Sequence, residues 1–346
     1  MFKYQKTRVN ILKKQRGVVF MSRIDNCLIE YKAWCKKLGI ETISDINKII
    51  SSGKINRLIN ISEIWHEQKL SEIAKQIQKN CSEKKIILIS GPSSSGKTTF
   101  ANRLNLHLKV LGINSVPISL DDYYMSFEDM PKNEHGKPDF EALESIDYKQ
   151  FNKDVETLIS GKEANLPTYN FQKRITTYSP LKLDRDEVII VEGIHGLNPE
   201  ITKNIPSENK YKIYCSALTA LSYDDGTRIK SRTNRLIRRL IRDFHFRNSD
   251  YKFTLGIWEE VEKGAEKNIF PYTDTADIIF NSSSLYELAV YRNYLGNVLP
   301  SDINENDEYY DVIKNLTGLT GLFLPVNESS VPDLSIVREF IGESKL

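Results

Sequence analysis

The chain has 346 residues, a formal net charge of +2 and 40% hydrophobic residues. This length and apolar content suffice for one large α/β domain plus an accessory piece, and the small net charge by itself implies neither an acidic nor a basic partner. The four cysteines form no CxxC motif, the apolar runs are short, and no secretory signal is visible. We therefore expect a cytoplasmic protein without a disulfide framework or a membrane span.

The first 80 residues indicate an accessory segment that is mainly helical, after a short start that could be a strand. Apolar residues keep helical spacing from Ile61 through Trp65 and Leu70 to Ile77. The N-terminus is basic, with no acid before Asp25. A transit peptide or a nucleic-acid arm would explain that charge, but we favour a solvated part of a folded region. A larger module could be truncated here.

The most informative motif is an apolar run, residues 86–90, followed by GxxxxGK[ST], the loop that cradles phosphates. Glycines let the backbone curl around an anion, the lysine carries positive charge to the outer phosphates, and Thr98 opens a helix and can offer its hydroxyl to Mg²⁺. A helical pattern then runs from Phe100 to Leu111 and closes at Gly112. The predicted nucleotide-binding residues are Gly91, Pro92, Ser93, Ser94, Ser95, Gly96, Lys97, Thr98 and Thr99.

Strands and helices alternate after this loop. We expect strands at 115–120, 188–191, 212–216 and 277–280, and helices at 147–161, 232–245 and 253–266. Nearly all-apolar strands in such an alternation predict an α/β fold with a doubly wound parallel sheet, here of the P-loop kinase type. We assign residues 81–300 to this kinase domain and 301–346 to a C-terminal extension packed on it.

Two acidic residues follow predicted strands, where an open parallel sheet binds its ligand. Asp121 could accept a proton from an attacking hydroxyl or bind Mg²⁺, or it could be a turn aspartate, as Asp122 could be. Glu192 ends the strand at 188–191, where Mg²⁺ or a bound water would explain its charge; the alternative is an exposed loop residue. His195 lies in the same loop, and we include it among the substrate contacts although a lone histidine is more often structural.

The helix at 232–245 carries four arginines at i, i+3, i+4 and i+7 spacing, which places them on one face: Arg235, Arg238, Arg239 and Arg242. They could form a lid that stabilises charge on a transferring phosphoryl group, or a nucleic-acid patch. Apolar residues and Asp243 within the helix favour a packed helix and hence the lid. Residues 166–171 could line an acceptor pocket or form a hairpin edge.

Together these motifs resemble the uridine kinase and phosphoribulokinase family. The resemblance covers residues 85–288 and rests on the loop at 91–99, Leu120 to Tyr124, Asp139-Phe140-Glu141, 167–171, 191–196 and 238–243. The segments 61–67 and 331–342 look like parts of a long bacterial-type subgroup, whose members carry N-terminal modules similar to those of threonyl-tRNA synthetase.

The resemblance implies roles for matching positions. Lys97 would hold the β- and γ-phosphates, Thr98, Asp121 and Glu192 would surround Mg²⁺, and Asp121 would also be the base for a nucleoside 5′-hydroxyl. The implied lid or substrate-binding arginines are Arg239 and Arg242, with Arg247 replacing a lid arginine expected near Ser249. The implied acceptor contacts are Tyr124, Tyr169, which would pack on the nucleobase, and Glu141 or, if the loop shifts, Asp139, which would hold the ribose hydroxyls.

The positions that should read the nucleobase depart from the family pattern. Uridine-cytidine kinases have a histidine shortly after the tyrosine, where this chain has Arg174, and an expected glutamine falls at or near Ile257. Arg174 stays among the candidate substrate contacts. Uridine or cytidine is thus an expectation from the family rather than from these residues.

We therefore expect a kinase that uses ATP or GTP with Mg²⁺ to phosphorylate a nucleoside. Alternatives are another small hydroxyl metabolite, such as a phosphosugar or a pantothenate-like compound, and an ATP-dependent RNA-binding regulator without kinase activity. Asp121 and Glu192 together argue against the regulator, because a pure binder needs no base. We expect a small-molecule partner rather than nucleic acid or a membrane, and a homo-oligomer is compatible with the sequence.

Overall fold

The computed structural model describes residues 21–80, 85–170, 175–184 and 186–346. Five strands form a parallel sheet in the order β2-β5-β1-β6-β7, and two form an antiparallel hairpin. The sheet strands are β1 (Ile86–Ser90), β2 (Ser115–Ser119), β5 (Val188–Glu192), β6 (Lys210–Ser216) and β7 (Ile278–Asn281), and the hairpin strands are β3 (Ala164–Asn170) and β4 (Ile175–Leu181).

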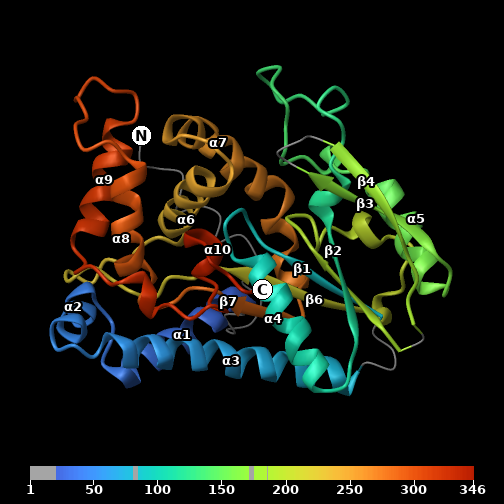
Figure 1. The fold of residues 1–346 in the computed structure, drawn as a ribbon, viewed down its shortest axis with the longest axis horizontal. Coiled ribbons are helices and arrows are strands. Elements are labelled where there is room, and N and C mark those ends of the chain that lie inside the picture. The colour runs from blue at the N-terminus through green and yellow to red at the C-terminus, as the bar shows by residue number, and fades with distance from the viewer. Residues whose placement is uncertain (1–20, 81–84, 171–174, 185) are drawn as a thin grey trace, which may run out of the picture.

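Ten α-helices surround these strands in the described residues. They are α1 (Arg23–Leu38), α2 (Ile43–Ser51), α3 (Ile55–Lys79), α4 (Lys97–Val110), α5 (Tyr148–Ile159), α6 (Ser231–Phe246), α7 (Tyr251–Asn268), α8 (Glu287–Val298), α9 (Tyr310–Gly321) and α10 (Arg338–Ile341). Figure 1 shows α3 running along the base of the molecule, α8 and α9 at one end, and α5 with the hairpin at the other. The expected α/β fold and helical N-terminal segment are confirmed.

Side chains of the central strand point alternately into two hydrophobic cores. Ile87 and Ile89 pack in one core with residues of α3, α4, α6 and α8, whereas Ile86 and Leu88 pack in the other with residues of α5. A strand that is buried on both faces needs apolar side chains at successive positions, which is why β1 has no polar alternation. The sheet is therefore covered on both faces, as a doubly wound fold requires.

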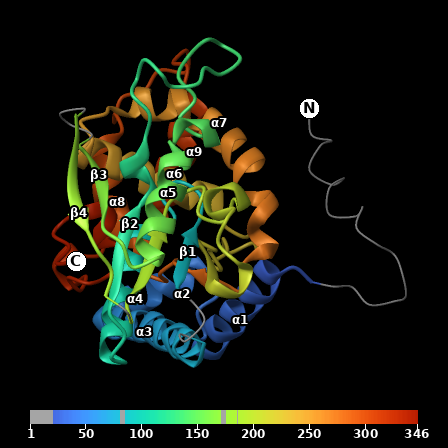
Figure 2. The ribbon, with the colours of Figure 1, turned by 90° about the vertical axis from the view of Figure 1, so that its right-hand side faces the viewer.

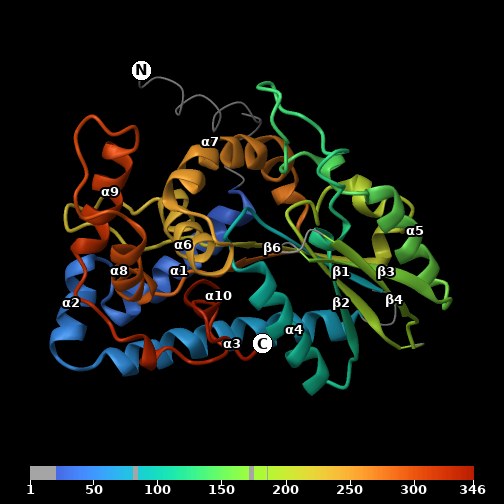
Figure 3. The ribbon, with the colours of Figure 1, turned by 45° about the horizontal axis from the view of Figure 1, so that its top comes forward.

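The segments outside the expected kinase domain share its first core. Residues of α1 to α3 and of the C-terminal segment 331–341 belong to the same hydrophobic cluster as β1 and α4. Figures 2 and 3 show α3 at the bottom of the molecule and α7 toward the top. The structure thus seats both terminal segments against the domain that carries the P-loop, while the basic stretch before residue 21 lies outside the described residues.

The predicted elements lie where the sequence places them. Asp147 accepts a hydrogen bond from Gln150 N at 3.0 Å and so begins α5, because an N-cap carboxylate satisfies a free amide of the first turn. Residues 164–170 form β3 of the hairpin, so of the two interpretations offered for 166–171 the hairpin edge is the one observed. None of the helices among the described residues combines the length and apolarity that a membrane span needs.

Candidate active site

The strand order places three groups at one edge of the sheet. Because β5 lies between β2 and β1, Asp121 after β2, Glu192 at the end of β5 and the P-loop after β1 are consecutive neighbours. The carboxyl ends of parallel strands meet at this edge. The sequence motifs that lie far apart along the chain are therefore brought together as expected.

Backbone geometry explains two of the loop residues. Gly96 precedes α4 with φ +82°, a left-handed conformation that favours glycine. Gly91 needs space instead: a Cβ there would lie 2.0 Å from the carbonyl oxygen of Cys215 in β6. The expectation that both glycines serve backbone conformation is thus wrong for Gly91, where close approach of two backbones is the reason. Ser94 itself has φ +59°.

The loop is held by a side chain of its own, Lys97, and by one from the segment after β7, Ser282. Lys97 is buried, and its Nζ donates to the carbonyl of Pro92 at 3.3 Å. Ser282 Oγ donates to the carbonyl of Ser95 at 2.5 Å. The hydroxyls of Ser94 and Ser95 are buried without a hydrogen-bond partner among the described residues. These contacts hold the loop in place before α4, where its backbone amides are available to an anion such as a phosphate.

Oxygen ligands gather beside the start of α4. Glu192 Oε1 lies 3.4 Å from Thr98 Oγ1 and accepts a hydrogen bond from Ser119 Oγ at 2.9 Å. Burial and the nearby charge of Asp121 raise the pKa of Glu192 to about 7, against the opposing effect of Lys97. Two carboxylates and a hydroxyl are the hard oxygen donors that Mg²⁺ takes, and the excess negative charge gives a cation a reason to bind. Thr98, Asp121 and Glu192 therefore fit the expected magnesium ligands.

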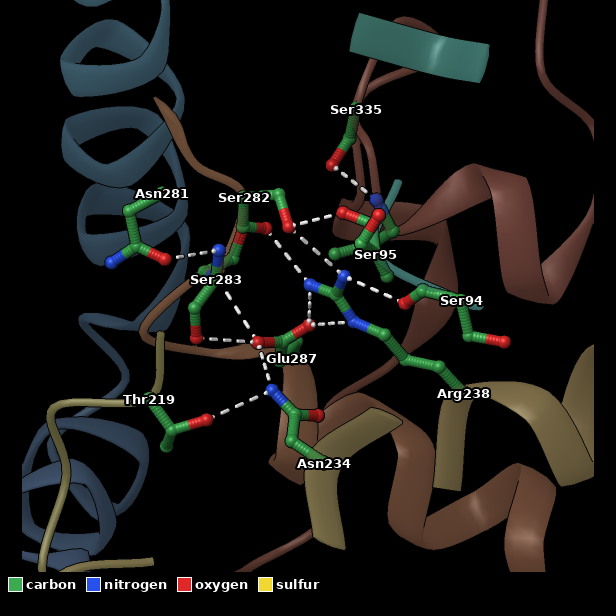
Figure 4. A network of polar contacts seen from close by, with 12 residues as sticks. Ser94, Ser95, Thr219, Asn234, Arg238, Asn281, Ser282, Ser283, Glu287 and Ser335 are labelled. Carbon is green, nitrogen blue, oxygen red and sulfur yellow. Dashed lines mark hydrogen bonds and ion pairs between the residues drawn. The ribbon is translucent and has the colours of Figure 1, made fainter. Parts of the chain in front are cut away.

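The four arginines of α6 lie on one side of the helix but bind different partners. Arg235 pairs with Glu262 of α7. Arg238 is fully buried against Glu287, with Nη2 to Oε2 at 2.6 Å, and Figure 4 shows that it also reaches the carbonyl of Ser94 and the hydroxyl and carbonyl of Ser282. Arg235 and Arg238 are thus neutralised by a partly buried acid, Glu262, and a buried one, Glu287, and α6 is a packed helix.

Arg239 and Arg242 both face Asp243, and Arg239 also reaches the loop. Arg239 Nη1 donates to Ser93 Oγ at 2.8 Å, and its Nε donates to Asp243 at 3.0 Å. Arg242 Nε lies 3.6 Å from Asp243 Oδ1, and Arg247 Nη1 lies 3.6 Å from the same oxygen. Burial and the neighbouring Arg247 lower the pKa of Arg242 to about 10. One carboxylate serves three guanidinium groups, so this corner retains positive charge for an anion.

The expected acceptor contacts surround a second corner. Glu141 N donates to Asp139 Oδ1 at 3.0 Å, and the Glu141 side chain packs against Gly264, where a Cβ would lie 2.2 Å from Glu141 Cβ. Glu141 Oε2 is buried without a hydrogen-bond partner in the described part of the chain. Burial raises the pKa of Glu141 to about 7. A carboxyl oxygen so placed can receive a hydroxyl of a bound ligand.

Other acceptor candidates join the same corner through backbone contacts. Tyr124 OH donates to the carbonyl of Phe140 at 3.2 Å, and His195 Nε2 lies 3.2 Å from the carbonyl of Ala142. Burial lowers the pKa of His195 to about 4, so its ring is neutral near pH 7. Tyr169 lies on β3, whose backbone amide at this residue donates to Asp122 Oδ1 at 2.9 Å. Asp122 therefore links the segment after β2 to β3, 47 positions further along the chain, whereas Arg174 lies outside the described residues.

Sequence reasoning missed the residues that hold the site from outside. Glu287 binds Arg238, Asn234 and Ser283, and Ser282 bonds the P-loop (Figure 4). Glu339 of α10 accepts a hydrogen bond from the amide of Thr99 at 3.1 Å. Glu287 and Ser282 lie in the polar segment 281–287, directly after a predicted strand. That position was a signal that could have pointed to them. Nothing local in the sequence pointed from residue 339 to residue 99.

The fold and the site define a class of protein: a P-loop phosphotransferase, with a triphosphate loop, strand-end carboxylates and packed arginines at one sheet edge. A sequence model of the Phosphoribulokinase / Uridine kinase family matches residues 86–289, more than half of the chain. The chain belongs to this family.

Individual relatives are distant. A uridine kinase of Ureaplasma parvum is 23% identical over 216 residues, which cover 62% of this chain and 96% of that protein. A uridine kinase of Borrelia duttonii is 29% identical over 217 residues, covering 61% and 95%. A solved structure described as a possible uridine kinase from Bacillus stearothermophilus has 18% identity and a TM-score of 0.39, and covers 61% of this chain and all of that one.

Proposed function

We propose that the protein transfers the γ-phosphoryl group of ATP, or GTP, to the 5′-hydroxyl of a nucleoside. The observation that carries this proposal is the meeting of Asp121, Glu192 and the P-loop at consecutive strand ends. One carboxylate at this edge would serve Mg²⁺ in any nucleotide site, whereas a second one is suited to accept the proton of an attacking hydroxyl.

The chain's own residues supply the steps. The carboxylate of Asp121 accepts the proton of the hydroxyl, the hydroxyl oxygen forms a bond to the γ-phosphorus, and the bond from that phosphorus to the bridging oxygen breaks to release the nucleoside diphosphate. Lys97 and the corner formed by Arg239 and Arg242 stabilise the negative charge of the phosphates, while the fixed loop orients them. Mg²⁺ held by Thr98, Asp121 and Glu192 would neutralise phosphate charge when it is bound.

The nature of the acceptor is supported less directly. Relatives named uridine kinase match about 60% of the chain, and Glu141 offers a buried carboxyl oxygen to a sugar hydroxyl. Uridine and cytidine are therefore the first acceptors to test. The burial of Arg235 and Arg238 in ion pairs favours a small-molecule acceptor over RNA, because buried and paired guanidinium groups make poor phosphate contacts along a surface.

A coupled assay of ADP release against a panel of nucleosides, sugar phosphates and pantothenate tests the proposal. Stimulation by uridine or cytidine is expected, stimulation by another class would reassign the acceptor, and no stimulation would refute kinase activity. Asp121→Asn should lower kcat by about 10²–10⁴-fold with little change in ATP affinity. Asp122→Asn is the matched control, because it removes the neighbouring charge and keeps an oxygen for the amide of Tyr169. Full turnover in Asp121→Asn would refute the assignment of the base.

A further inference from the structure

The C-terminal segment 331–342 places a carboxylate on the helix that follows the P-loop. Glu339 Oε2 accepts a hydrogen bond from the amide of Thr99 at 3.1 Å. Thr99 is the third residue of α4, so its N–H is among the first-turn amides that have no acceptor within the helix. An acidic group from the far end of the chain therefore caps this helix.

The carboxylate of Glu339 occupies a place where the phosphates of a bound nucleotide would lie. In a loop of the GxxxxGK[ST] type, the loop amides and the first turn of the helix together receive the phosphates. The helix dipole favours one anion at this point, and two anions cannot share the same donor. The carboxylate of Glu339 therefore adds negative charge at the point where a triphosphate would bring more.

The segment is seated directly on the loop. A Cβ at Gly96 would lie 2.7 Å from Ile336 Cγ2. Ser335 Oγ donates to Glu63 of α3 at 2.8 Å and lies 2.9 Å from the hydroxyl of Tyr286. The ring of Phe340 lies 4.9 Å from the guanidinium carbon of Arg238, the arginine that bonds the P-loop carbonyl.

The segment also has its own internal anchor. Arg338 donates to the carbonyls of Val331 at 2.8 Å and of Glu328 at 3.0 Å, which closes the turn that presents the next residue. The hydrogen bonds of Arg338 thus fix the turn that positions Glu339 against α4.

We propose that segment 331–342 is an autoinhibitory plug, in which Glu339 competes with the phosphates of the donor nucleotide for the amides at the start of α4. Nucleotide binding displaces Glu339 and loosens the segment from the loop. This inference rests on the proposed function only in that the loop must bind a nucleoside triphosphate.

Equilibrium binding of the ATP analogue AMPPNP by the full chain tests the competition. Glu339→Gln keeps the size of the side chain and an oxygen for the amide of Thr99 but removes the charge, and it should bind the analogue roughly tenfold more tightly than the wild type. Glu208→Gln is the matched control: it removes one exposed carboxylate just before β6, at the opposite edge of the sheet, and should leave the affinity unchanged. Equal or weaker binding by Glu339→Gln would overturn the inference.

Amide hydrogen exchange separates displacement from closure. Adding AMPPNP to the wild type should speed exchange in residues 331–342, because the plug leaves the loop. Unchanged or slower exchange would show that the segment stays on or closes over the nucleotide, and would overturn the inference. If neither the wild type nor Glu339→Gln binds the analogue, the triphosphate site itself is refuted; if both bind it equally, only the plug is.

Discussion

Replacing Glu287 by glutamine tests whether one buried acid holds the site together. Its Oε2 accepts from Arg238 Nε at 2.9 Å and Nη2 at 2.6 Å, and its Oε1 accepts from Asn234 Nδ2 at 2.8 Å and Ser283 Oγ at 2.8 Å. The side chains of Arg238 and Glu287 are 0% and 1% exposed. All the groups around this carboxylate are donors, so a glutamine amide must turn its own NH₂ toward one of them.

The expected loss of stability follows from the burial of the ion pair between Arg238 and Glu287. Removing one partner of a buried ion pair leaves an uncompensated charge, which costs about 3–5 kcal/mol. This is a large share of the roughly 5–15 kcal/mol that stabilises a typical protein. Since Arg238 also bonds the carbonyl of Ser94, we expect weaker nucleotide binding in the protein that remains folded.

Urea denaturation followed by circular dichroism measures the change in the free energy of unfolding. Glu259→Gln is the matched control, because Glu259 pairs with Arg232 between α6 and α7 but these side chains are 71% and 46% exposed. The same chemical change there should cost no more than about 1 kcal/mol. A loss at Glu287 as small as the loss at Glu259 would refute the expected cost of leaving Arg238 buried without its acid.

Three further outcomes follow from the site. Glu141 has a pKa raised by burial to about 7 from an ordinary 4.5, so the stability of the wild type is greatest below pH 4.5 with respect to this group and falls as the pH rises through 7. Glu141→Gln should therefore gain up to about 3 kcal/mol over the wild type between pH 5 and pH 8 in urea denaturation; a pH-independent difference would contradict this. Gly264→Ala should displace Glu141 and lower kcat/KM for the acceptor by about 10²-fold while the Kd for ATP is kept; equal loss of both would argue for a general defect. Gly91→Ala brings a Cβ against the Cys215 carbonyl and should lower the free energy of unfolding by about 1–3 kcal/mol or more, which thermal denaturation would measure; a wild-type Tm would contradict the close approach.

The parts of the site that local sequence encodes could be predicted. The P-loop, Asp121 and Glu192 lie at or just after the carboxyl ends of strands, and the rule that parallel strands present these ends at one edge was enough to bring them together. The helical spacing of the arginines likewise predicted a helix correctly. Spacing alone could not assign their partners, because the acids that pair with Arg235 and Arg238 lie 27 and 49 residues further along the chain.

The sequence by itself determined the local elements, the phosphate loop and the residue types at the strand ends, since these depend on short-range periodicity and backbone chemistry. Only the tertiary structure decided that Arg238 supports the loop through Glu287, that Gly91 is required by a neighbouring backbone, and that Glu339 caps the helix after the loop. These contacts join residues 49, 124 and 240 positions apart. These residues become neighbours only when the chain folds, so no local pattern in the sequence predicts the contacts between them.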